Sequence, residues 1–101
     1  MNYLASEIMP FGYDFSKELE KKIIKLRKRD PKRLEILYKK VNEIINSGEE
    51  EIDRYKNLKQ DLSDRKRVHI DKSFVLTFSF DRKNRHILFL DFDHHDKIYV
   101  R

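Results

Sequence analysis

The chain has 101 residues, of which 41% are charged and 39% are hydrophobic, with a formal net charge of +5 and no cysteine. This length suits one domain with a single core, which we expect to span residues 1–101. The lack of cysteine excludes a disulfide scaffold and a thiolate metal site. The sequence has no long apolar run and no signal-like start, so we expect a cytoplasmic protein without a membrane span.

The first half of the chain predicts a short strand followed by two helices. Residues 11–15 form the expected strand, and Ser16 is a suitable N-cap for a helix that ends near Arg29. The pair Asp30–Pro31 is typical of an N-cap and a first helical position, so it begins the second helix. Apolar residues follow helical spacing up to Gly48, which we expect to cap the end of that helix.

The second half predicts a sheet. Residues 49–64 are polar and indicate mostly irregular structure, anchored by Leu58 and Leu62. Alternating apolar residues then predict three antiparallel strands with short turns, a β-meander. These strands cover residues 67–70, 74–80 and 86–92. The expected fold is therefore α+β, with an N-terminal short strand and an αα-hairpin packed on one face of an antiparallel β-meander.

Uninterrupted alternation assigns each side chain of the meander to one of two faces. The helix-covered face receives the phenylalanines of the middle strand together with Leu88, Leu90 and Phe92. The opposite, open face receives polar and ionisable residues: Arg67, His69, Asp71, Thr77, Asp91, Asp93 and His95. Three apolar residues should share the open face: Val75, Ile87 and Phe89. A loop of the same chain or an amphipathic partner helix is expected to cover them.

Basic residues gather in two places. Nine Lys or Arg against three acids lie from Lys17 to Arg33, which indicates either a solvated helix face or a surface for an anionic partner. The second group, Arg65–Arg67, opens the strand that carries His69, and Lys72 follows that strand. Cations beside imidazoles are what phosphate chemistry requires. This second group therefore favours a nucleic-acid substrate.

The C-terminal segment DFDHHD, residues 91–96, contains the donor types of a metal site. Adjacent His94 and His95 should point apart on an extended chain, and no HExxH-type pair is present. Neighbouring cations would also repel a divalent ion, so we expect no metal ion and no cofactor. A polar tail without chemistry and the catalytic edge of an RNA-binding surface are the other readings, and the nearby cations favour the catalytic edge.

Three segments in this order carry a family resemblance: a paired-helix segment, YKNLKQDLSDRKRVHIDKSFVLTF and DFDHHDKIYV. On these segments, the chain resembles the RelE/ParE toxin superfamily, and most of all its RelE and YafQ branches of mRNA interferases. The resemblance covers residues 13–99. It implies the toxin of a type II toxin–antitoxin module, held in a hetero-oligomer by an acidic, RelB-like antitoxin. It also implies an endoribonuclease that needs no metal and acts with the ribosome and mRNA as partners. In that activity, a ribose 2′-hydroxyl attacks the neighbouring phosphate of mRNA in the ribosomal A site.

The resemblance also assigns roles to residues. Matches to the family's catalytic positions are His69, His95, Arg67 and Tyr99. The histidines would transfer protons, Arg67 with Lys66 would stabilise the phosphate, and Tyr99 would orient or stack on a base. The RNA-binding candidates are Lys56, Arg65, Lys66 and Lys72.

The chain departs from the family pattern at four positions. Val75 replaces an arginine that many members carry, and Lys56 stands where a YafQ-like histidine is expected. Gln60 and Asp64 replace the two glycines of the loop. Two other functions therefore stay open: a ParE-type poison of DNA gyrase that does not cut RNA, and an RNA-binding module without activity.

Overall fold

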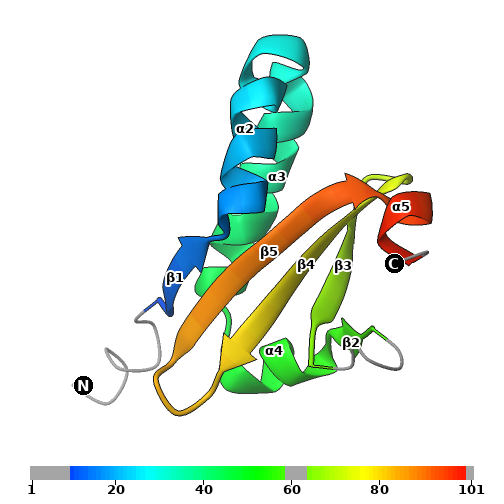
Figure 1. The fold of residues 1–101 in the computed structure, drawn as a ribbon. Helices are drawn as coiled ribbons and strands as arrows, with labels where there is room; N and C mark the ends of the chain where they lie inside the picture. The colour runs from blue at the N-terminus through cyan, green and yellow to red at the C-terminus, as the bar shows by residue number, and fades with distance from the viewer. Residues whose placement is uncertain (1–9, 59–63, 100–101) are drawn as a thin grey trace.

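The computed structural model describes residues 10–58 and 64–99, so the predicted anchor Leu62 lies outside the described residues. Within them, five strands form one sheet in the order β1-β5-β4-β3-β2, with α2 and α3 against one of its faces (Figure 1). The strands are β1 Gly12–Phe15, β2 Lys56–Asn57, β3 Lys66–Ile70, β4 Phe74–Asp81 and β5 His86–His94. The helices are α2 Lys17–Arg29, α3 Pro31–Ile45, α4 Glu49–Arg54 and α5 His95–Tyr99.

The α+β fold predicted from the sequence is confirmed. Strands β3, β4 and β5 form the antiparallel meander, and β1 extends it by pairing parallel with β5. The short strand β2 pairs antiparallel with β3 at the other edge. The sheet is therefore mixed and wider than the meander that alternation alone predicts. None of the helices in the described part of the chain is both long and apolar enough to cross a membrane.

The two long helices begin where their capping residues predict. The Ser16 hydroxyl accepts a hydrogen bond from the Leu19 N–H at 3.0 Å and so caps α2. The Asp30 carboxylate accepts one from the Arg33 N–H at 3.1 Å and caps α3, whose first residue is Pro31. Each cap satisfies a backbone donor that has no partner inside its helix.

The prediction for the segment after α3 is wrong in two respects. The helix ends at Ile45 with Asn46 as its C-cap, and Gly48 is instead the N-cap of α4. The polar run that suggested irregular structure places acidic residues in the first turn of α4, where the helix dipole stabilises them. A single apolar residue of α4, Ile52, is fully buried and holds this short helix against the core.

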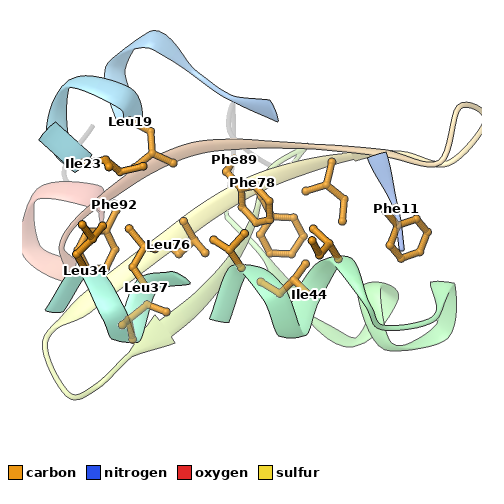
Figure 2. Close-up of a cluster of buried hydrophobic side chains, with 14 of the residues drawn as sticks. Phe11, Leu19, Ile23, Leu34, Leu37, Ile44, Leu76, Phe78, Phe89 and Phe92 are labelled. Atoms are coloured by element: carbon orange, nitrogen blue, oxygen red, sulfur yellow. The ribbon is translucent and has the colours of Figure 1, made fainter. Parts of the chain in front are cut away.

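The main core lies between the helices and strands β4 and β5 (Figure 2). The labelled side chains of α2 and α3 point toward those of the two strands. Six of the labelled residues have no exposed surface: Leu19, Leu37, Ile44, Leu76, Phe78 and Phe89. Burial of such side chains contributes about 1.5–3 kcal/mol each, so this layer orients the sheet relative to the helices.

A β-bulge in β5 changes which residues enter this core. Thr77 is paired with Asp91, but the next residue of β4, Phe78, is paired with Phe89, so Leu90 is an extra residue. One extra residue reverses the alternation of every position before it in the strand. The prediction that Phe89 lies on the open face is therefore wrong.

The same bulge corrects the neighbouring assignments. Ile87 and Phe89 have no exposed surface and belong to the main core, whereas Leu88 and Leu90 are partly exposed. Ser16 fixes the bulge, because its hydroxyl donates to the Leu90 carbonyl at 2.5 Å and its N–H donates to the Phe89 carbonyl at 2.8 Å. The residue that caps α2 thus also holds the irregular point of β5.

The open face has a small apolar cluster of its own. Val75 is fully buried there and packs with Leu58, just after β2, and with Ile98 of α5. We predicted that either the same chain or a partner helix would cover Val75, and segments of the same chain do so. A partner helix docked across residues 75–89 is excluded, because two of the three apolar residues expected there lie in the main core.

Candidate active site on the open sheet face

Basic and imidazole side chains of three elements meet on the open face of the sheet. Lys56 of β2 lies opposite Arg67 of β3, and residues opposite each other in antiparallel strands share a face. Val68 and Ile70 pack against the main core, so Arg67 and His69 of the same strand face the other way. Lys56, Arg67 and His69 therefore form one group, with roughly 5 Å between neighbouring strands and roughly 7 Å along β3.

The C-terminal helix α5 lies at the end of this face (Figure 1). The His95 N–H donates to the Ser73 carbonyl in the β3–β4 turn at 2.8 Å, and Ile98 packs on Val75. Val75 is also the residue of β4 that lies opposite His69. The helix that begins with His95 thus contacts the residue beside His69.

The other predicted RNA-binding residues lie around this group. The Arg65 carbonyl accepts a hydrogen bond from the Leu58 N–H at 2.8 Å, which places Arg65 next to the apolar cluster of the open face. Lys72 is exposed in the turn between β3 and β4. Tyr99 is the last residue of α5, and its side chain lies outside the described part of the chain.

Lys66 does not join Arg67 on the open face. Adjacent strand residues point to opposite faces, and the Lys66 ammonium donates to the Tyr55 carbonyl and to the Asn57 side chain, each at 3.3 Å. We predicted that Lys66 and Arg67 stabilise one phosphate together, but their side chains lie on opposite faces of the sheet.

The prediction that Asp71 lies on the open face is also wrong. Asp71 has a positive φ of 47° in the turn after β3, and the alternation of the strand does not continue through it. Its carboxylate lies 3.6 Å from the Arg33 guanidinium of α3. That guanidinium also lies over the Phe74 ring at 4.1 Å, so Asp71 belongs to a contact with the helices.

Two aspartates of β5, which we predicted on the open face, form salt bridges with a lysine of α2. The Lys22 ammonium donates to Asp91 at 2.6 Å and to Asp93 at 2.8 Å. The strand β1 covers β5 only from His86 to Phe89, so the edge beyond this point is open for Lys22 to reach across. Sequence reasoning missed Lys22, because it lies 69 and 71 residues from its partners within a run of basic residues.

The ion pairs decide the protonation of these groups. Burial alone would raise the pKa of Asp93, but the hydrogen bonds from Lys22 and from the His94 N–H, with the charge of Lys22, outweigh burial and lower that pKa below its usual value. Burial also opposes the charge on Lys22, yet the hydrogen bonds to both carboxylates raise the pKa of its ammonium. Lys22 and Asp93 are therefore both charged near neutral pH, so Asp93 is a structural ion-pair partner and a poor general acid.

Replacing Lys22 with methionine should lower the free energy of unfolding near pH 7 by about 2 kcal/mol, because two carboxylates lose a charged donor. Folding lowers the pKa of Asp93. Its stabilisation is therefore full above the unfolded pKa of about 3.9 and is lost as the pH falls through the lower, folded pKa. Folding raises the pKa of Lys22, so its contribution is full below about 10.4 and is lost as the pH rises through the folded pKa.

Urea unfolding at a series of pH values measures this effect. The Lys22→Met protein should lose less stability between about pH 5 and pH 2 than the wild type does. Lys25→Met is the matched control, since Lys25 is an exposed residue of the same helix and its replacement should change stability by less than about 0.5 kcal/mol. Parallel pH profiles for wild type and Lys22→Met would contradict the assignment.

The histidines of the C-terminal segment do not point apart, as an extended chain would require. Strand β5 ends at His94 and α5 begins at His95, so the backbone turns between them. Their rings stack with centroids 4.7 Å apart and planes at 26°. The His94 Nδ1 lies 3.5 Å and the His95 Nδ1 lies 3.1 Å from carboxylate oxygens of Asp96.

Solved structures with this fold include toxins. The RelBE2 toxin–antitoxin complex of Mycobacterium tuberculosis aligns with a TM-score of 0.69 at 16% identity, covering 86% of this chain and 93% of that one. A metal-bound toxin from Helicobacter pylori aligns with a TM-score of 0.65 at 20% identity, covering 87% of this chain and 98% of that one. The fold is therefore one that toxins of toxin–antitoxin systems adopt.

Sequence comparison gives the family, although no family model matches the chain. A protein of Methanocaldococcus jannaschii named "Putative toxin RelE4" is 50% identical over 95 residues, which are 94% of this chain and 89% of the relative. An uncharacterized protein of Methanosarcina mazei is 51% identical over 82 residues, which are 81% of this chain and 91% of that relative. The chain belongs to the RelE toxin family, as its sequence motifs predict.

Proposed function

We propose that this toxin inhibits translation by cutting mRNA in the ribosomal A site, as an endoribonuclease that uses no metal ion. The observation that carries the proposal is the placement of Lys56 and Arg67 beside His69 on an open sheet face, with α5 and His95 at its end. Phosphoryl transfer needs cations for the charge of the transition state and groups that move protons. On this face the cations and the histidines come from separate elements of the fold.

The proposed reaction transfers two protons. One histidine, in its neutral form, accepts the proton of the ribose 2′-hydroxyl, whose oxygen then attacks the adjacent phosphorus. The bond from phosphorus to the 5′-oxygen breaks, and the second histidine, in its protonated form, donates a proton to that leaving oxygen. The products are a 2′,3′-cyclic phosphate and a 5′-hydroxyl. His69 and His95 are the candidates for these roles.

Arg67 is the proposed clamp for the phosphate. Arg67→Gln should lower the cleavage rate by about 10²–10³, the range for loss of one donor that stabilises a transition-state charge. Lys66→Gln is the matched control, because it removes a cation from the next residue, whose side chain bonds to Tyr55 and Asn57. Its cleavage rate should stay within about tenfold of the wild type. Similar losses in the two variants, measured on ribosome-bound mRNA, would argue against a specific role for Arg67.

The function is tested by adding the purified protein to cell-free translation and mapping mRNA ends by primer extension. Cuts phased with codons in ribosome-bound mRNA, and no cuts in the same mRNA without ribosomes, support the proposal. DNA breaks that require gyrase would indicate a ParE-type poison instead. RNA binding without cleavage or gyrase-dependent breaks would indicate a binding module, and both of these results would overturn the proposal.

The proposed partner in the resting state is an acidic, RelB-like antitoxin in a hetero-oligomer. The net charge of +5 and the exposed cations of α2 favour an acidic chain. Next to these cations, α3 and β1 form a groove lined by Tyr13, Phe15, Tyr38, Val41, Asn42 and Ile45. Tyr13 and Tyr38 are 45% and 40% exposed, which is unusual for large apolar side chains that lie together.

An amphipathic antitoxin segment is proposed to lie in this groove with its acidic side toward α2. Hydrogen exchange of the toxin should become slower in β1 and along the exposed side of α3 when the antitoxin is added. Unchanged exchange in both elements, in a complex that forms by native mass spectrometry, would contradict this location of the antitoxin.

A further inference from the structure

Three consecutive residues at the junction of β5 and α5 bring metal-binding atoms together. His94, His95 and Asp96 each offer one ligand atom, and these atoms all lie within 4.8 Å of one another. Both imidazoles direct Nδ1 toward the Asp96 carboxylate, at 3.5 and 3.1 Å. Two ligands bound to one tetrahedral Zn²⁺ at about 2.0–2.2 Å are separated by roughly 3.3–3.5 Å. The two printed contacts to Asp96 are close to this spacing, and the upper limit of 4.8 Å leaves small side-chain movements to complete the shell.

The contacts between these side chains are weak enough for a metal ion to replace them. The His94 Nδ1 accepts the backbone N–H of Asp96 at 3.3 Å and lies 3.5 Å from a carboxylate oxygen of the same residue. Both distances are longer than those of a strong hydrogen bond. A divalent ion that binds the neutral imidazole and the carboxylate would replace these contacts with shorter metal–ligand bonds.

The surroundings hold these ligands in place. The His94 ring packs edge-on against Phe74, with centroids 5.7 Å apart. The backbone N–H of His94 donates to the Asp93 carboxylate at 2.8 Å, and the N–H of His95 donates to Ser73 at 2.8 Å. Ligands on a fixed backbone lose little conformational freedom when they bind an ion. All three ligand residues are at least partly exposed, so an ion can enter from solvent.

We propose that His94, His95 and Asp96 bind a divalent transition-metal ion of the Zn²⁺ class. Two imidazoles and one carboxylate suit Zn²⁺, Ni²⁺ or Cu²⁺ and disfavour Mg²⁺, which requires oxygen ligands. Three protein ligands leave a position for water, so the ion exchanges with solvent. This site shares His95 with the chemistry proposed above, but that chemistry itself uses no metal ion.

The site has a regulatory consequence that rests on the proposed function. A metal ion on the His95 Nδ1 makes that imidazole unable to exchange a proton there, and it adds a bulky hydrated ion to the edge of the RNA face. Bound Zn²⁺ should therefore inhibit mRNA cleavage. Because His94 has no part in the proposed proton transfers, its replacement should keep cleavage and remove the inhibition.

Equilibrium dialysis of the untagged full-length protein against ZnCl₂ tests the site without any activity assay. The wild type should retain one Zn²⁺ per chain and His94→Gln and His95→Gln should each bind at least about tenfold more weakly. His86→Ala is the matched control, since that histidine pairs with Asp14 at the opposite end of β5 and should not change binding. Thermal unfolding confirms that each variant is folded, and Mg²⁺ in place of Zn²⁺ should not be retained.

Three results would overturn the site. These are no Zn²⁺ retained by the wild type, binding unchanged in both glutamine variants, and binding lost equally in His86→Ala. The inhibition is tested separately, by cleavage of ribosome-bound mRNA with and without Zn²⁺ in wild type and His94→Gln. Zn²⁺ binding without any cleavage activity would leave the site standing and refute the proposed function. Inhibition that is equal in both proteins would refute the regulatory role.

Discussion

His95→Ala should lower the rate of mRNA cleavage by about two to four orders of magnitude, and His69→Ala should do the same, because each removes a group to which the proposed mechanism assigns a proton transfer. The two histidines belong to elements that both contact Val75, which is the proximity that the proposed mechanism requires. The rate is measured in single-turnover reactions with excess toxin on stalled ribosomes, followed by primer extension. These reactions report the chemical step without contributions from product release.

His86→Ala is the control for both histidine variants. His86 lies at the start of β5 and pairs with Asp14 at 2.9 Å, far along the strand from the C-terminal helix. Its replacement should leave the cleavage rate within about twofold, because a surface substitution away from the site costs little stability. Full activity in His95→Ala and His69→Ala would remove both residues from the mechanism.

Phe89→Ala should lower the free energy of unfolding by about 3–5 kcal/mol, the range for loss of a buried phenylalanine. Phe89 has no exposed surface and its ring lies 5.9 Å from Phe78 and 5.7 Å from Phe15. This loss is a large part of the roughly 5–15 kcal/mol that stabilises a typical domain. Urea unfolding followed by circular dichroism measures it.

Leu88→Ala is the comparison that makes the Phe89 result informative. Leu88 is partly exposed, and its replacement should cost only about 1 kcal/mol. Uninterrupted alternation along β5 would put Leu88 in the core and Phe89 on the open face. It therefore predicts a larger loss of stability for Leu88→Ala than for Phe89→Ala. A larger loss in Leu88→Ala than in Phe89→Ala would contradict the bulge at Leu90.

The two long helices and the meander could be predicted because local signals define them. Ser16 and the Asp30–Pro31 pair mark the helix starts, and alternation marks the strands. The bulge at Leu90 could not be predicted, because nothing in the apolar run around it identifies the extra residue. The bulge is hydrogen-bonded to Ser16, which is 74 residues away in the sequence and donates to the Leu90 carbonyl. The extra residue reverses the predicted positions of Ile87 and Phe89.

The candidate site could be predicted only where it depends on local alternation within one strand. Arg67 and His69 follow from the alternation of one strand, but Lys56 joins them only because β2 forms, and β2 is too short to be read from the sequence. The links of Asp91 and Asp93 to Lys22 depend on the packing of α2 beside the open edge of β5. The stacking of His94 on His95 depends on where the strand ends and α5 begins.

The central claim is that groups on the open face cut RNA by accepting the proton of the 2′-hydroxyl and donating a proton to the leaving 5′-oxygen. The chemical groups at the ends of the cut mRNA test this claim most directly. Mass spectrometry of fragments from toxin-treated, ribosome-bound mRNA identifies the group at each new end. The proposed mechanism predicts a 2′,3′-cyclic phosphate on the upstream fragment and a 5′-hydroxyl on the downstream fragment, both absent with His95→Ala. A 3′-hydroxyl with a 5′-phosphate would require attack by water and would contradict the mechanism.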